Sequence, residues 1–275
     1  MARCSVVVTV RNEEARVGRL LASLVGQDGL HEVVLVDAAS TDGTVAQARA
    51  FEGRLPLRIV VEPCSRGAGR NRGAALATGD LLAFIDADCE AAPGWVAALA
   101  AAWGGDAQRA VAGRTTVVGP RRYARLHRVE LPHRGQDTTW PSCNLAYPKA
   151  VFDGLGGFDP AFVTAEDIDL NYRAVEAGVT LAQAPEACVT AQSRAALGGF
   201  LRQAYWNGYG RKQLTLKHGD LWHEYSLRRL LSLDALSPWA VLRLASGLVG
   251  YLDAKLGRPA PGAQPSTTPS PAVVS

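Results

Sequence analysis

The feature that most constrains this chain is a short apolar run that ends in two aspartates separated by one residue. The run covers residues 81–85, and Asp86, Ala87 and Asp88 follow it directly. Continuous apolar runs of this length are typical of strands that are buried on both faces of a parallel sheet. Ligands of such sheets bind at the carboxyl ends of the strands, and residues i and i+2 of a strand point the same way. The pattern therefore predicts that Asp86 and Asp88 face one ligand.

Two carboxylates at one strand end suit a hard divalent cation. Mg²⁺ and Mn²⁺ prefer oxygen ligands and are commonly shared between a few carboxylates and the phosphates of a substrate. We therefore predict a Mg²⁺ or Mn²⁺ site at Asp86 and Asp88. An isolated Asp-x-Asp (DXD) pattern also occurs as two solvated acids at a turn, so both interpretations stay open at this point.

Strand and helix patterns alternate along the first two thirds of the chain. The strands are predicted at 5–10, 32–37, 57–62, 81–86, 109–118, 142–147, 180–184 and 187–190. Helical patterns are found between them, at 17–24, 44–50, 93–103, 149–155 and 164–174, and the segment at 66–77 is predicted as a loop that leads into a helix. Such alternation is typical of a wound α/β sheet flanked by helices, and 275 residues suffice for one large domain of this class.

Composition and charge exclude several functional classes. The formal net charge is +3, which argues against a dedicated nucleic-acid binder. The five cysteines are scattered without a Cys-x-x-Cys pair, so neither a zinc site nor a disulfide framework is expected, and the odd count fits a reducing compartment. The sequence has no signal-peptide pattern and no uncharged apolar run of about 18 residues. We expect a cytoplasmic protein, with peripheral contact at the cytoplasmic membrane left open.

A glycine-rich segment at 66–73 follows the third predicted strand. Its spacing, Gly-x-Gly-x-x-x-Gly, is one residue longer than the dinucleotide-binding fingerprint, which would also follow the first strand. Arg66, Arg70 and Arg72 lie near the predicted start of a helix, where anions bind favourably. The segment therefore predicts a nearby anionic group such as a diphosphate. A solvated basic helix face is the alternative, and it applies best to Arg72.

Three acids, Glu166, Asp167 and Asp169, fall in the first turn of the helix predicted at 164–174. The helix dipole favours acids there, and Thr164 is a suitable N-cap residue. A purely structural role in helix capping is therefore the alternative to any catalytic role for these acids.

The C-terminal third is basic and helical. Helical patterns cover 197–216 and 227–256, with a break near Pro238, and ten Lys or Arg residues stand against four Asp or Glu between positions 194 and 258. Basic residues interspersed with Trp and Tyr suit an anionic membrane surface, while packing on the sheet or a contact between copies of the chain stays open. We expect three parts: a catalytic domain at 1–193, a helical region at 194–256 and a disordered Pro-rich tail at 257–275.

Several spaced motifs together resemble the family 2 glycosyltransferases, which adopt the GT-A fold of nucleotide-diphosphosugar transferases. The similarity runs from about residue 5 to residue 184 and implies a mixed sheet with flanking helices and a C-terminal helical extension. The motifs are an opening strand and nucleotide loop at 8–14, a base-binding turn at 36–44, a segment at 70–73 with 78–80, the metal motif at 85–88, and acceptor-side motifs at 156–159 and 166–170.

The resemblance implies a role for each matching position. In the family pattern the nucleoside pocket would be lined by Thr9, Arg11, Glu13 and Asp37, and Arg70 would lie near the nucleotide. Asp86 would face both ribose and metal, and Asp88 would bind the metal directly. Asp167 would be the general base, with Glu166 and Asn144 at the acceptor hydroxyl.

The implied function is that of a metal-dependent, inverting glycosyltransferase of the hexosyltransferase type. Its donor would be a UDP- or GDP-linked sugar, and its acceptor would carry a hydroxyl group, with lipid-linked acceptors and cell-envelope glycans as candidates. A retaining transferase, a sugar nucleotidyltransferase and a non-catalytic nucleotide-sugar-binding module are the alternatives, and a homo-oligomer stays open.

Two departures from the family pattern bear on the site. Ala38 and Ala39 replace the Asp-Gly that is common after the first acid of the base-binding turn. Many members also carry a metal-site histidine after the last strand, and here Ala191 occupies that position, followed by Gln192. Because an alanine offers no ligand, this departure motivates the binding-module alternative.

Overall fold

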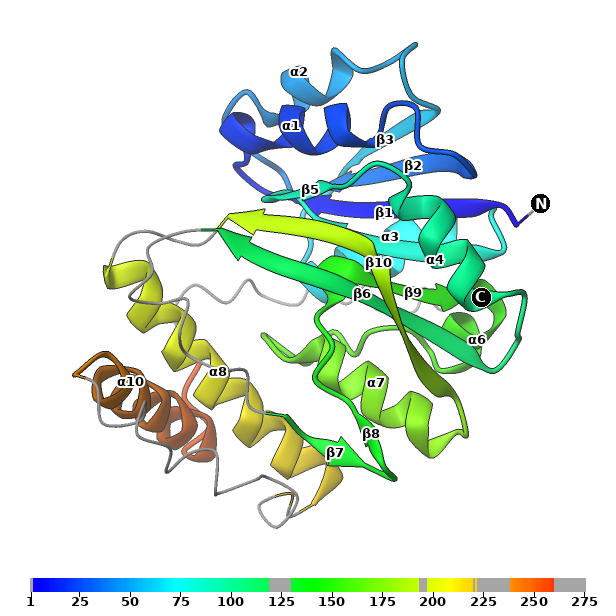
Figure 1. The fold of residues 1–275 in the computed structure, drawn as a ribbon. Coiled ribbons are helices and arrows are strands. Elements are labelled where there is room, and N and C mark those ends of the chain that lie inside the picture. The colour runs from blue at the N-terminus through cyan, green and yellow to red at the C-terminus, as the bar shows by residue number, and fades with distance from the viewer. Residues whose placement is uncertain (1, 119–129, 193–196, 220, 222–237, 260–275) are drawn as a thin grey trace, which may run out of the picture.

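One eight-stranded sheet organises the fold, with the strand order β3-β2-β1-β4-β9-β6-β10-β5 (Figure 1). The computed structural model describes residues 2–118, 130–192, 197–219, 221 and 238–259. The strands of the sheet are β1 (Cys4–Val10), β2 (Leu30–Asp37), β3 (Leu57–Val61), β4 (Leu81–Asp86), β5 (Cys89–Ala91), β6 (Arg109–Val118), β9 (Leu145–Pro148) and β10 (Thr180–Gln192). A separate two-stranded ribbon consists of β7 (Pro132–His133) and β8 (Gln136–Asp137).

The sheet is mixed, as the resemblance implied. The strands β3, β2, β1 and β4 run parallel to one another. The next strand, β9, is antiparallel to both β4 and β6. β10 runs parallel to β6, and the short β5 closes the edge in the antiparallel sense. The predicted fold class, a wound α/β sheet flanked by helices, is confirmed.

Both faces of the central strands are covered, which explains their continuous apolar sequence. Along β1, Val6 and Val8 belong to one core cluster and Val7 to the other, because successive side chains of a strand point to opposite faces. The first cluster lies under α1 (Glu14–Leu24), α2 (Thr44–Arg49) and α4 (Trp95–Trp103). The second lies under α3 (Arg66–Leu76), α6 (Lys149–Gly154) and α7 (Glu166–Glu176).

The glycine-rich segment is helical from Arg66 onward, whereas we predicted a loop that leads into a helix. The Ser65 hydroxyl accepts a hydrogen bond from the backbone N–H of Ala68 at 3.3 Å and so caps the helix. The glycines allow α3 to approach β1 closely, since a Cβ on Gly73 would lie 2.5 Å from Cγ1 of Val7. Close packing on the sheet, rather than a phosphate-binding loop, therefore accounts for the glycines.

Two strand predictions differ from the structure. The segments at 180–184 and 187–190 are one strand, β10, whose register against β6 shifts between Ala184 and Cys188. The strand predicted at 142–147 begins as a 3₁₀ turn over Ser142–Asn144 and becomes extended only in β9. The first difference is an irregularity of strand pairing and the second is a local turn, and short apolar patterns encode neither.

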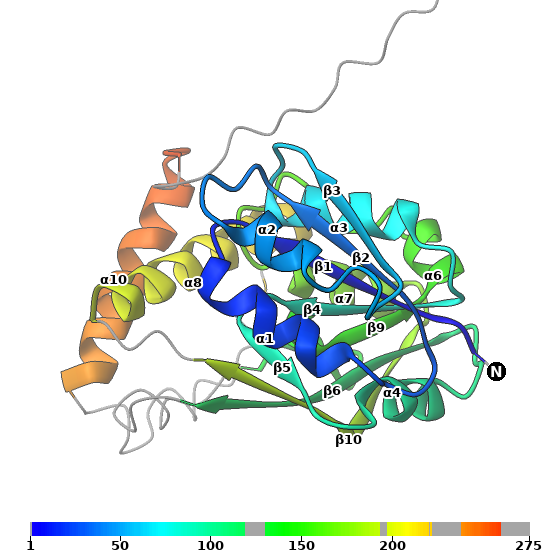
Figure 2. The same cartoon turned by 90° about the horizontal axis from the view of Figure 1, so that it is seen from above.

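The C-terminal helices α8 (Leu197–His218) and α10 (Pro238–Lys255) lie side by side, on the side of the molecule toward which β6 and β10 run (Figures 1 and 2). α10 begins at Pro238, where the predicted break falls. Residues 227–237 of the predicted helix at 227–256 and residues 260–275 of the predicted tail at 257–275 lie outside the described residues. Among the helices of the described ranges, none has the length and apolarity required to cross a bilayer.

Candidate active site

Three of the predicted nucleotide-site residues lie together at the carboxyl ends of neighbouring parallel strands. We call this end of the sheet the strand edge. In the strand register, Thr9 of β1 stands opposite Asp86 of β4, and Val10 stands opposite Asp37 of β2. The Asp-x-Asp pattern therefore lies beside the opening strand, at the edge where α/β sheets bind ligands.

Arg70 links this edge to the acids of α7. Its side chain is 2% exposed, its Nη2 lies 2.6 Å from Oδ1 of Asp86, and its Nη1 lies 2.6 Å from Oε1 of Glu166. The guanidinium carbon also lies 5.4 Å from the centre of the Phe158 ring. One buried cation therefore holds a carboxylate of the predicted metal motif and a carboxylate of the predicted acceptor motif.

The ion pairs of Arg70 with Asp86 and Glu166, which we call the Arg70 bridge, stabilise the charges that they join. Burial alone would lower the pKa of the Arg70 guanidinium, but the carboxylates of Asp86 and Glu166 raise it above its ordinary value. Burial opposes ionisation of Asp86, yet the charges of Arg70 and Arg66 hold the pKa of that carboxyl below its ordinary value. The two pKa shifts favour the charged forms of both Arg70 and Asp86.

Asp88 lies in a different electrostatic environment. Burial raises the pKa of its carboxyl, and the neighbouring charges of Asp86 and Glu13 raise it further. Its Oδ1 accepts a weak hydrogen bond from the thiol of Cys89 at 3.6 Å. An excess of negative charge around a half-buried carboxylate fits a divalent cation, which would relieve the repulsion. Within the described ranges, no three His, Cys, Asp or Glu side chains converge as a metal site.

The end of β10 runs past the metal motif. Ala191 pairs with Cys89 in the antiparallel register, and the backbone N–H of Gln192 donates to the carbonyl oxygen of Asp88 at 3.2 Å. The position where many family members carry a histidine is thus adjacent to Asp88, and it holds an alanine methyl group.

Asp167 is positioned by hydrogen bonds from two segments. Its Oδ2 accepts from the backbone N–H of Ser142 at 3.0 Å and from the Ser142 hydroxyl at 3.4 Å, and its Oδ1 accepts from the N–H of Ile168 at 2.9 Å. Burial and the charge of Glu166 raise the pKa of Asp167 to about 6. The sequence had not indicated Ser142, because its contact with Asp167 joins residues that are 25 positions apart.

The start of α7 differs from the prediction. The N-cap residue is Ala165, with φ at 63°, and no side chain caps the helix, so Thr164 is not the N-cap. Each of the three acids has its own distant partner instead of a shared capping role: Glu166 pairs with Arg70, Asp167 with Ser142, and Asp169 with residues of α7 and α8. Helix capping alone therefore does not account for these acids.

Asp169 is a structural anchor between α7 and α8. Its buried carboxylate lies 2.9 Å from Arg173, 2.8 Å from Nζ of Lys217 and 2.8 Å from Nε2 of His218. Although burial raises the pKa of Asp169, hydrogen bonds from His218 and Lys217 and the charge of Arg173 lower it to about 2. This cluster fixes the C-terminal helix to the helix that carries Glu166 and Asp167.

Asp37 and Asn12 shape the predicted nucleoside loops from within. Asp37 is fully buried, and its two oxygens accept from the backbone N–H of Ser40 at 2.7 Å and from the Ser40 hydroxyl at 2.5 Å. Asn12, with φ at 54°, accepts from the N–H of Thr41 at 2.9 Å. The base-binding turn and the opening loop are thereby joined, and Ala38 and Ala39 fit within that turn.

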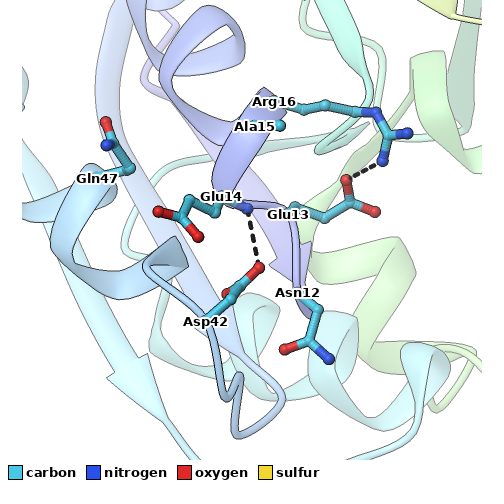
Figure 3. A pocket seen from close by; sticks show the side chains of 7 residues that line it. All are labelled: Asn12, Glu13, Glu14, Ala15, Arg16, Asp42 and Gln47. Carbon is cyan, nitrogen blue, oxygen red and sulfur yellow. Dashed lines mark hydrogen bonds and ion pairs between the residues drawn. The ribbon is translucent and has the colours of Figure 1, made fainter.

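Arg11 and Glu13 lie in the opening loop, where Arg11 is exposed and Glu13 half-buried. Oε2 of Glu13 lies 2.6 Å from Nη1 of Arg16. An open pocket surrounds this loop and is lined by Asn12, Glu13, Glu14, Ala15, Arg16, Asp42 and Gln47 (Figure 3). Its lining carries three acids and one arginine, so its net charge is unfavourable for a diphosphate alone.

The amide of Asn144, which the resemblance assigned to the acceptor, makes two hydrogen bonds inside the protein. It is fully buried, its Oδ1 accepts from the indole N–H of Trp95 at 2.8 Å, and its Nδ2 donates to the carbonyl oxygen of Ala187 at 2.9 Å. The amide therefore braces α4 against β10.

Comparison with known proteins identifies the family. Residues 5–158, more than half of the chain, match the profile described as "Glycosyl transferase family 2". The chain belongs to this family of glycosyltransferases, which confirms the resemblance and the predicted enzyme class.

A curated relative, the pre-mycofactocin glycosyltransferase of Mycobacterium tuberculosis, is 29% identical over 263 residues, covering 89% of this chain and 53% of its own. The chain thus spans about half the length of the first curated relatives that it matches.

Solved structures share the fold. A mannosyltransferase from Pyrobaculum calidifontis in complex with GDP-Man and Mn²⁺ gives a TM-score of 0.64 at 22% identity, covering 96% of this chain and 77% of its own. Staphylococcus aureus TarS in complex with UDP-GlcNAc gives 0.63 at 19% identity, covering 92% and 81%. The GT-A architecture is therefore confirmed by three-dimensional similarity.

We predict that Arg70→Met destabilises the protein by about 3–5 kcal/mol, because it leaves Asp86 and Glu166 buried without their shared cation. The matched control is Arg72→Met in the same helix, whose exposed ion pair with Glu62 spans 3.2 Å and contributes about 1 kcal/mol or less. Denaturant unfolding of both variants measures the difference. Equal and small losses would contradict the bridge.

Proposed function

We propose that the chain transfers a sugar from a nucleotide-diphosphate donor, UDP- or GDP-linked, to a hydroxyl acceptor with inversion at the transferred carbon. The observation that carries this proposal is the Arg70 bridge, which holds Asp86 of the metal motif and Glu166 of the acceptor-side motif on one guanidinium. Transfer requires the donor diphosphate and the acceptor hydroxyl to meet in one place, and the bridge supports a single site for both.

The donor side consists of Asp88, Asp86 and Thr9 at the strand edge. Asp88 and Asp86 would hold Mg²⁺ or Mn²⁺, and the crowding of their charges with Glu13 supports this assignment. A bound divalent cation neutralises the charge that develops on the leaving diphosphate. Asp37 would shape the nucleoside pocket through its turn with Ser40, and Arg11 and Glu13 would line it.

The acceptor side consists of Asp167 and Glu166. Asp167 would act as the general base that removes the proton of the acceptor hydroxyl, and its raised pKa gives it the basicity for that task. Glu166 would orient the hydroxyl while its own position is fixed by Arg70. One carboxylate group for the metal and another for the acceptor favour a single in-line displacement, hence inversion, over a double displacement.

We extend the proposal to the class of acceptor, a hydroxyl borne by a lipid-linked intermediate or a cell-envelope glycan. The support is the helical pair α8 and α10, which lies on the side of the molecule where β6 and β10 end (Figure 1). Large apolar side chains of α10 are exposed there. A transfer assay with lipid-linked and water-soluble hydroxyl acceptors separates the two classes.

One observation favours a second candidate, a nucleotide-sugar-binding module without turnover. Ala191 adjoins the metal motif where a histidine would complete the metal site. Release of free nucleotide from UDP- and GDP-sugars with Mg²⁺ or Mn²⁺ distinguishes the enzyme from the module, which would bind a donor and never consume it. A sugar nucleotidyltransferase would instead consume a nucleoside triphosphate.

We predict that Asp88→Asn lowers metal-dependent donor turnover by about 10²-fold or more, because Lewis-acid stabilisation of the leaving group contributes several kcal/mol. The matched control is Asp153→Asn on α6, whose carboxylate is 52% exposed and pairs with Lys149. Nucleotide release is measured against Mn²⁺ concentration for both variants. An Asp88→Asn protein with wild-type turnover and metal dependence would refute the assignment.

We predict that wild-type transfer rises with pH through about 6, because Asp167 must be ionised to act as a base and its pKa is raised to about 6. Asp167→Asn should bind the donor normally, lose about 10²-fold or more in transfer, and no longer show this rise. Rates at saturating donor and acceptor from pH 4.5 to 8, about 1.5 units below and 2 above that pKa, measure the profile. A variant that is destabilised but transfers at the wild-type rate would support a structural role instead.

A further inference from the structure

The helices α8 and α10 touch through their smallest residues. A Cβ on Gly208 would lie 1.8 Å from the carbonyl oxygen of Gly247, and one on Gly250 would lie 2.0 Å from the carbonyl oxygen of Tyr205. The Ser246 hydroxyl donates to the carbonyl oxygen of Leu201 at 2.7 Å across the same contact. The side of α10 that carries small and polar residues therefore faces α8.

The outer side of α10 is consequently apolar, the reverse of an ordinary surface helix. With 3.6 residues per turn, its exposed Leu and Val side chains fall within one arc of roughly 160°. These side chains are between 41% and 65% exposed and belong to Val241, Leu242, Leu244, Leu248, Val249, Leu252 and Leu256. Apolar patches of this extent on a protein surface mark sites of interaction. We call these seven side chains the outer face of α10.

Basic residues predominate in the described parts of the two helices and their ends. In 197–219 and 238–259, seven residues are Lys or Arg and one is Asp. The single acid, Asp253, already accepts from the Tyr205 hydroxyl at 3.0 Å and pairs with Arg258 at 3.2 Å. Burial and the nearby charge of Arg211 lower the pKa of Arg243. The seven basic residues are Arg202, Arg211, Lys212, Lys217, Arg243, Lys255 and Arg258.

Charge distinguishes the two surfaces that could cover the outer face. A second copy of the chain would bring the same basic surface against itself, because a two-fold interface apposes like with like. An anionic lipid surface would accept the apolar side chains at the headgroup boundary and pair its phosphates with the basic residues. Tyr251 and Trp239 on α10 are of the residue types that favour this boundary.

We propose that α10 is a membrane-docking helix that lies in the plane of an anionic lipid surface, with its outer face inserted between the headgroups. This proposal concerns a surface that carries none of the residues assigned to transfer, and it holds whether or not the transferase mechanism above is correct.

Vesicle co-sedimentation of the full chain tests the proposal. We expect binding to vesicles of phosphatidylcholine mixed with phosphatidylglycerol, weaker binding as salt rises, and little binding to phosphatidylcholine alone. Leu248→Glu, at a side chain that is 56% exposed, should lower the affinity about tenfold or more. The matched control is Val25→Glu at the end of α1, at a side chain that is 37% exposed, and it should bind like the wild type.

Three results would overturn the proposal. They are no binding to anionic vesicles at low salt, equal binding to neutral vesicles, and equal binding by Leu248→Glu and the wild type. Light scattering of the same proteins tests the alternative, in which the outer face joins two copies of the chain. In that case the wild type would be a dimer, and Leu248→Glu would convert it to a monomer without a change in vesicle binding.

Discussion

The buried guanidinium of Arg70 is the interaction on which the arrangement of this site depends. A charge with 2% exposure is tolerated only when it is paired, and Arg70 is paired at 2.6 Å with both Asp86 and Glu166. Those carboxylates come from β4 and α7, which are far apart in the chain. The same ion pairs that neutralise the arginine therefore fix the separation of the two groups of acids.

Other features of the fold bring the three partners together. The close approach of α3 to β1, which Gly73 permits beside Val7, sets the depth at which Arg70 enters the sheet edge. At the other end of the bridge, Asp169 ties α7 to α8 through Lys217 and His218. The C-terminal helices are thus joined to the helix that carries Asp167, so the outer face of α10 has a fixed orientation relative to the site.

The central strands could be predicted from local patterns of apolar residues, and the family from the order of its motifs. The resemblance implied that Thr9, Asp37 and Asp86 contact one nucleotide, and the strand register brings these residues to the same end of the sheet. The partners within the site could not be predicted in this way. Glu166 lies 96 positions from Arg70, and Ser142 lies 25 positions from Asp167, so no periodicity connects them. Asn144 was assigned to the acceptor by resemblance, whereas its amide is used between Trp95 and Ala187. The helical pattern of α10 was found, but which of its sides faces α8 depends on contacts of Gly247 and Gly250.

A double-mutant cycle on Asp86→Asn and Glu166→Gln tests the central bridge most directly, with the free energy of unfolding as the measured quantity. If both carboxylates share Arg70, removal of the second should cost more than removal of the first, because only then is the guanidinium left without either ion-pair partner. We expect an interaction energy of at least about 0.5 kcal/mol, which vanishes when Arg70 is replaced by Met. Additive effects in the wild-type background, or an unchanged interaction energy in the Arg70→Met background, would contradict the bridge.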